Sequence, residues 1–300
     1  MDRACGVVVW SPAMSARAPL RVRKVQFAYP DDLAPHWNAR RPEWSQVVNA
    51  SSLLMPYLEP FLIDAVREAI PRIEDPALRE EAKAYLGQEA HHYKQHRRFN
   101  DLLLARGYEA LRAYEATLEA DYEGLRTRPL AFRLAYAAGF ETMALAIGHM
   151  LVRHRRFFFA DADPSVSSLV LWHFVEEVEH KRAAFDVYQA VVGSWSQRLG
   201  GLAYAMWHTL RRTRQAYVLL LRADGLWNRL RTRIAMKLLM ARIAAACFPR
   251  LLESLVPWHD PARVADPLWI REWVALYERG EPGLTRLDTH RIHLMPAALV

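Results

Sequence analysis

Two segments of the sequence each contain a glutamate followed three residues later by a histidine. The pairs are Glu89 with His92 and Glu177 with His180. Residues three apart lie on one face of an α-helix, so each pair can offer a carboxylate and an imidazole to the same metal ion. Both groups are ligands for iron, manganese and zinc. The spacing therefore predicts two metal-binding helices.

Helical bundles that bind two metal ions use two such pairs and add one glutamate from each of two further helices. The sequence offers Glu59 and Glu141 for these places, one before each pair. Apolar residues surround Glu59 and small residues surround Glu141, and a carboxylate that faces an apolar interior is costly unless it is paired or binds metal. We predict these metal ligands: Glu59, Glu89, His92, Glu141, Glu177 and His180.

The positions of the four glutamates agree with antiparallel helices. Glu59 and Glu89 lie at equal distances from a predicted turn, and Glu141 and Glu177 lie at equal distances from a point close to a second turn. Each pair is therefore level when its helices fold back on one another. The long gap between Glu89 and Glu141 leaves room for a crossover along the bundle, which is the ferritin-like connectivity.

Three further residues share helix faces with these ligands. Tyr85 and His96 lie on the face of Glu89, and His173 lies one turn before Glu177. Each histidine can be an additional ligand, a residue that hydrogen-bonds to a ligand, or a core histidine bonded to a neighbour. We favour the second role, because such partners are common around metal sites. Tyr85 has the same alternatives, with core packing as its commonest role.

The alternative to a metal site is a buried core of salt bridges. Charged residues are seldom buried without partners, and two Glu-x-x-His pairs with a level glutamate on each remaining helix favour metal. His91, Glu176 and Glu179 are predicted to point away from the site, with the two glutamates paired to Arg or Lys.

The elements that must hold these residues are helices, because long stretches contain neither Gly nor Pro. Asp163 before Pro164 is a predicted helix start, and Gly107 is a predicted helix end. The fold class is all-α: a ferritin-like four-helix bundle with a long crossover and additional C-terminal helices. The predicted helices are 51–72, 77–106, 108–126, 129–159, 164–192, 197–222, 226–255 and 267–279. The predicted units are an arm at 1–50, the di-metal bundle at 51–193 and a basic extension at 194–300 packed on it.

Composition limits the class of protein. The 300 residues are 52% hydrophobic and 24% charged, as in a soluble globular protein. The two cysteines, Cys5 and Cys247, exclude a disulfide framework and a cysteine-ligated metal. Residues 6–10 are too short an apolar run for a signal peptide core, so we expect a cytoplasmic protein. Met14 is an alternative start to Met1.

The net charge of +7 is concentrated in residues 194–255, where eleven Lys or Arg face only Asp224 and Glu253. Three interpretations stay open. A cationic amphipathic helix can lie on an anionic membrane surface, it can cover the bundle with its arginines in water, or it can attract an acidic substrate such as a fatty acid. No nucleic-acid motif is found, so no nucleic acid is expected as a partner. An oligomer is left open.

Two motifs resemble a known family. They are Gln88-Glu89-x-x-His92-x-x-x-His96 with Asn100, and Trp172-His173-x-x-Glu176-Glu177-x-Glu179-His180-Lys181 followed by Ala184-Phe185-Asp186-Val187-Tyr188. Together they look like the bacterial family usually labelled "predicted metal-dependent hydrolase". The resemblance covers roughly residues 22–192. It implies a metal site on these motifs and a hydrolytic reaction.

Three functions are compatible with these residues. Mixed carboxylate and imidazole ligands suit oxygen activation, so our first expectation is an oxygen-dependent oxidoreductase that acts on a small or lipid-like molecule. The alternative is a hydrolase that uses a water bridging the metals. The third is a metal-binding, membrane-associated protein without enzymatic activity. The expected cofactor is a pair of metal ions, with iron as the first choice and manganese or zinc as alternatives.

Overall fold

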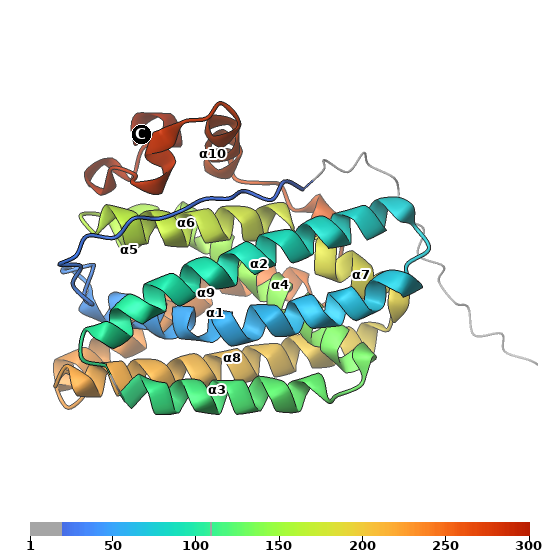
Figure 1. Ribbon diagram of the computed structural model, residues 1–300, viewed down its shortest axis with the longest axis horizontal. Helices are drawn as coiled ribbons and strands as arrows, with labels where there is room; N and C mark the ends of the chain where they lie inside the picture. Colours follow the sequence, from blue (N-terminus) through green and yellow to red (C-terminus); the bar gives the residue numbers. More distant parts are fainter. Residues whose placement is uncertain (1–19, 109) are drawn as a thin grey trace, which may run out of the picture.

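The computed structural model describes residues 20–108 and 110–300, and within these ranges the secondary structure is entirely helical. The chain forms a bundle of long helices, with α10 and the C-terminal turns on one side (Figure 1). The helices are α1 Pro42–Ala69, α2 Pro76–Ala105, α3 Ala110–Arg126, α4 Leu130–Arg153, α5 Arg155–Phe159, α6 Pro164–Glu179, α7 Ala183–Val191, α8 Trp195–Ala223, α9 Leu230–Glu253 and α10 Leu268–Glu278. The 3-10 turns are Ile70–Arg72, Pro261–Arg263, Pro282–Thr285, Thr289–Arg291 and Pro296–Ala298. Residues 1–19, with Cys5 and Met14, lie outside the described ranges.

Short connections join α1 to α2 and α4, through α5, to α6, while α3 links the two pairs (Figure 1). Local chemistry explains the ends of these helices. The carboxylate of Asp163 accepts hydrogen bonds from the backbone N–H groups of Ser165 and Val166, which confirms the predicted start of α6. Gly107 follows α2 with φ of +93°, which confirms its role as a helix end.

Three predicted helix boundaries are wrong. The first helix begins at Pro42 rather than at Ser51, because its first turns bury Trp44 and other apolar side chains against the bundle. Its start has no side-chain cap, and Pro42 at the first position is compatible with a helix. The predicted helix 129–159 breaks at His154, and the predicted helix 164–192 breaks between α6 and α7, directly at His180.

The central helix of the bundle is α4, which is buried along almost its whole length. It is long and apolar enough to cross a membrane by length and composition, yet 72% of that apolar window is buried inside the protein. A Cβ added at Gly139 would lie 2.6 Å from the Cα of Leu202, so glycine lets α4 and α8 pack closely. The apolar character of α4 is therefore that of a core helix.

Residues 20–41 are irregular, as predicted, but they are packed rather than free. This segment runs along α6 and α2 (Figure 1), and it buries Phe27, Trp37 and the side chain of Arg23. Because residues 20–41 lie against α2 and α6, their side chains can contact functional residues on these two helices.

Candidate metal centre

The six predicted ligands lie together in the interior, contributed by α1, α2, α4 and α6 together with the residue that follows α6. Each is at most 1% exposed. Ligand atoms of Glu59, Glu89 and His92 lie within 4.8 Å of one another, and so do those of Glu89, Glu141 and His180. The two groups share Glu89. Such buried Glu and His groups have the composition and size of metal sites.

The inner atoms of this cluster are unpaired. Among residues 20–108 and 110–300, no hydrogen-bond partner is found for either carboxylate oxygen of Glu59, Glu89 or Glu177. The same holds for Oε2 of Glu141. A buried polar atom without a partner costs about 1–3 kcal/mol, and more when it is charged. Seven orphaned acceptors converging on one interior region fit a bound cation.

His180 shows this most clearly. Its Nδ1 lies 3.0 Å from Oε1 of Gln88, whose own amide group donates to the backbone oxygen of Arg21, so Nδ1 of His180 must carry the hydrogen. In a neutral ring Nε2 is then a lone pair. It lies 3.3 Å from a carboxylate oxygen of each of three glutamates: Glu89, Glu141 and Glu177. Four acceptors face one another, and a metal ion would satisfy all of them.

His92 is held in a similar way by a residue that the sequence did not indicate. Its Nε2 lies 2.9 Å from Oε2 of Glu176, and its Nδ1 faces Glu89 at 3.7 Å and Glu177 at 3.6 Å. Glu176 is fully buried and also accepts from Arg23 at 3.2 Å. The predicted pairing of Glu176 with Arg or Lys is confirmed by Arg23, but the prediction that Glu176 points away from the site is wrong, because its carboxylate contacts the imidazole of His92.

The prediction for Glu179 agrees better with the structure. Its carboxylate is 21% exposed and is bound by the guanidinium of Arg23. His91 also lies outside the cluster, with Nε2 at 2.7 Å from the backbone oxygen of Val25. The sequence pattern indicates that Glu176 pairs with Arg or Lys. It does not show that Glu176 of α6 also contacts His92 of α2, because helical spacing gives no contacts between different helices.

A chain of hydrogen bonds orients His173. Asn100 donates to the backbone oxygen of Ser52 at 2.9 Å, so its side-chain oxygen accepts the Ser52 hydroxyl hydrogen at 2.6 Å. Oγ of Ser52 must then accept from Nδ1 of His96 at 2.8 Å, and Nε2 of His96 accepts from Nδ1 of His173 at 2.7 Å. Nε2 of His173 is left as a lone pair, 3.0 Å from Oε1 of Glu177.

This order of hydrogen-bond donors gives His173 and His96 different roles. His173 presents a free nitrogen to the cluster and shares a candidate group with His92 and Glu177. His96 uses both nitrogens on neighbours, so it orients His173, although its atoms also lie within reach of Glu59. Tyr85 donates to Oε1 of Glu141 at 2.8 Å and so fixes that carboxylate.

Without metal, several ionisable groups of the cluster have pKa values far from their ordinary ones. Burial and neighbouring carboxylates raise the pKa of Glu59 and Glu89 well above the ordinary value, and burial raises the pKa of Glu141 to about 7. Burial alone would lower the pKa of His180, but Glu141 and Glu177 raise it well above the ordinary value. Glu59, Glu89 and Glu141 are thus shifted toward their protonated forms unless another cation replaces the protons. Although burial alone would raise the pKa of Glu177, His180 and His173 lower it well below its ordinary value.

A narrow apolar cavity of about 180 Å³ adjoins the cluster. His96 and His173 line it together with side chains from α1, α4, α6, α8 and α9, most of them apolar. Leu210 of α8 lines the same cavity and is 57% exposed, so the cavity reaches the surface beside α8. An apolar molecule can therefore approach the cluster of Glu and His residues by this route.

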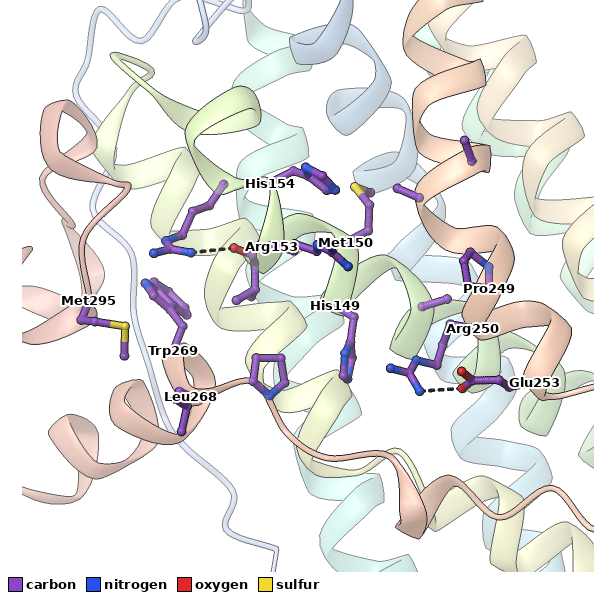
Figure 2. Close-up of a pocket in the computed structure, with 16 residues that line it drawn as sticks. His149, Met150, Arg153, His154, Pro249, Arg250, Glu253, Leu268, Trp269 and Met295 are labelled. Atoms are coloured by element: carbon purple, nitrogen blue, oxygen red, sulfur yellow. Dashed lines mark hydrogen bonds and ion pairs between the residues drawn. The ribbon is translucent and has the colours of Figure 1, made fainter.

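A wider cavity of about 630 Å³ lies elsewhere, between α4, α9 and the C-terminal segments (Figure 2). His149, Arg153 and Arg250 line it, with Arg250 bound to Glu253. None of the candidate ligands is among the described residues that line this cavity. The candidate site is therefore the buried cluster of Glu and His residues rather than this wider cavity.

Comparison with known proteins gives one match. A family model described as "Predicted metal-dependent hydrolase" matches residues 21–265. The matched region contains all the residues of the cluster and extends through α8 and α9. A search of curated proteins and a search of solved structures give no match.

Proposed function

Because this chain belongs to the family of predicted metal-dependent hydrolases, we propose that its buried cluster holds two metal ions that activate water for the hydrolysis of an apolar small molecule. The observation that carries the proposal is the set of buried, unpartnered ligand atoms in two groups that share Glu89. Glu89, which belongs to both groups, would help to hold each of the two ions.

The ligands divide between the two ions. One ion would be held by Glu59, Glu89 and His92, and the other by Glu89, Glu141 and His180. Glu177 lies near both histidines, at 3.6 Å from His92 and 3.3 Å from His180, and would also help to hold the ions. His173 would be a further ligand of the first ion, because His96 orients its free nitrogen toward the cluster. Glu176, Gln88 and Tyr85 would hold the ligands from behind.

Two ions of this kind supply a water of lowered pKa and a clamp for the oxygen of the leaving group. The residues of the chain do the remaining work. The apolar cavity would exclude bulk water and select an apolar substrate, and His173 in its wall would bring the reacting bond near the cluster. The ligand set suits iron, manganese or zinc, and iron is our first choice because carboxylates outnumber imidazoles.

A second candidate is the oxygen-dependent oxidation that the residue types first indicated. Four buried carboxylates would stabilise the higher charge of an oxidised metal ion, and an apolar cavity suits a hydrocarbon substrate. The same ligands serve both reactions, so the description of the family decides our order of preference. Hydrolysis comes first and oxidation second.

The test separates the two reactions. Metal-free protein is loaded anaerobically with iron(II), manganese(II) or zinc(II) and is mixed with p-nitrophenyl esters of increasing acyl length. We expect metal-dependent release of p-nitrophenol without oxygen, increasing with acyl length until the cavity is full. The control variant is Glu80→Ala, which removes an exposed glutamate of α2 and should behave like wild type.

The iron(II) form is also mixed with oxygen while its optical spectrum is followed. No ester hydrolysis together with a fast charge-transfer band would contradict the hydrolase and support the oxidoreductase. Hydrolysis that persists in the metal-free protein would contradict both candidates.

A further inference from the structure

One face of α9 is apolar along its whole length and is exposed. Leu230 is 70% exposed, Leu238 67% and Phe248 61%. At about 100° per residue, seven exposed apolar residues of α9 fall within a stripe roughly 80° wide, and the exposed Ala244 and Pro249 lie outside it. The stripe consists of Leu230, Ile234, Leu238, Ala241, Ala245, Phe248 and Leu252. With 24 residues, the helix presents this stripe over about 36 Å.

The stripe does not cover the bundle. The buried residues of α9 are Thr232, Met236, Leu239 and Cys247, which lie on the opposite side of the helix. The interpretation in which the apolar face of α9 packs on the bundle is therefore wrong for Ile234 and Leu238. An apolar stripe of this length on the outside of a protein marks an interaction surface.

Cations flank the stripe on both sides. Arg231 and Arg242 lie along one edge and Arg233 and Lys237 along the other, all exposed. Within the described ranges, none of the four forms a salt bridge. An apolar stripe between two rows of cations matches the interface of an anionic bilayer, where acyl chains lie below acidic headgroups.

We propose that α9 docks on an anionic membrane surface with this stripe facing the acyl chains. A second copy of the chain is a poorer occupant, because pairing two stripes would bring the two cationic rows together. The proposal does not depend on the metal chemistry. If the proposed function also holds, the apolar cavity, which Leu210, Met240 and Ile243 line from α8 and α9, would receive its substrate from the lipid phase.

The test is co-sedimentation of the full chain with phosphatidylcholine vesicles, with and without phosphatidylglycerol, at low and high salt. We expect binding to the anionic vesicles that weakens with salt. Ile234→Asn with Leu238→Asn should lower the partition coefficient by roughly tenfold or more. Arg233→Gln with Lys237→Gln should weaken binding to anionic vesicles only.

Controls come from other surfaces. Val22→Asn removes an exposed apolar side chain near Gly87 of α2, and Lys83→Gln removes an exposed cation of α2; neither should change binding. All variants should keep the wild-type metal content and melting temperature, because the changed side chains are exposed. Metal content and melting temperature therefore distinguish a loss of membrane binding from a loss of the metal site.

Three results would overturn the proposal. They are no sedimentation with either vesicle, equal sedimentation with both, or a dimer in analytical ultracentrifugation that the Ile234→Asn, Leu238→Asn variant dissociates. The last result would make the stripe a contact between copies.

Discussion

Nε2 of His92 lies 2.9 Å from the buried carboxylate of Glu176, on the side of the ring that faces away from the other glutamates. Glu176 can therefore hold a hydrogen on Nε2 and leave Nδ1 free for metal. It is itself held by Arg23, which belongs to the segment before α1. The site thus extends beyond the four helices that carry its ligands.

Glu176→Ala should weaken binding of the first metal ion by about 10–100-fold, because His92 loses the partner that fixes its ring. The measurement is a chelator competition that resolves the affinity of each ion. Glu179→Ala is the control, since Glu179 also binds Arg23 but does not contact His92. Equal affinities in wild type and Glu176→Ala would contradict this role.

The sequence predicted which candidate ligands lie together in the structure, but it did not predict the residues that surround them. Helical periodicity and level spacing identify the faces of Glu89 and Glu177, because metal ligands must share a face and a height. They give no information on contacts between residues remote in sequence. Arg23 with Glu176 and Gln88 with His180 are such contacts.

In the fold, too, local features could be predicted from the sequence and features that depend on tertiary packing could not. The all-helical class and the limits of α2 follow from local pattern, Asp75 and Gly107. The early start of α1 does not, because it depends on burial of Trp44 by tertiary packing. The exposed stripe of α9 was visible as an amphipathic pattern, but only the structure shows that its apolar side faces outward.

His173 and His96 should differ in their effect on the metal. His173→Ala removes a proposed ligand, whereas His96→Ala removes only the partner that orients it. In cobalt(II)-loaded protein we expect His173→Ala to change the visible ligand-field bands and to lower affinity more than His96→Ala does. Identical spectra of wild type and His173→Ala would show that His173 is not a ligand.

The stability of the metal-free protein should rise as pH falls from about 8 to 6.5. In this window the folded protein takes up protons on Glu141, whose pKa is about 7, and it favours the protonated forms of Glu59, Glu89 and His180, whose pKa values lie well above the ordinary ones. The unfolded chain keeps these carboxyls ionised, so the folded state binds more protons and lower pH favours it.

Bound metal displaces these protons, so the metal-loaded protein should not show this rise. Below pH 6.5 the trend should reverse, because burial lowers the pKa of His92 and His96 while the unfolded chain protonates its histidines. Melting temperatures across the range measure both effects. A melting temperature of the metal-free protein that falls steadily from about pH 8 to 6.5 would refute the proposed balance.

Filling the narrow cavity should change substrate length without changing metal content. Ala144→Leu places a larger side chain in the cavity wall and should lower kcat/KM for long-chain esters more than for short ones. Ala203→Leu on the exposed surface of α8 is the matched control. An equal loss for all chain lengths would show that the cavity does not hold the acyl chain.

The most direct test of the metal centre is the metal content of protein loaded anaerobically with iron(II) and freed of excess. We predict about two ions per chain in wild type and in Glu80→Ala. Glu59→Ala and Glu141→Ala should each retain about one ion, because each residue belongs to one group that includes Glu89. Glu89→Ala should lose both. Full metal content in Glu89→Ala, or no stoichiometric metal in wild type, would contradict the account.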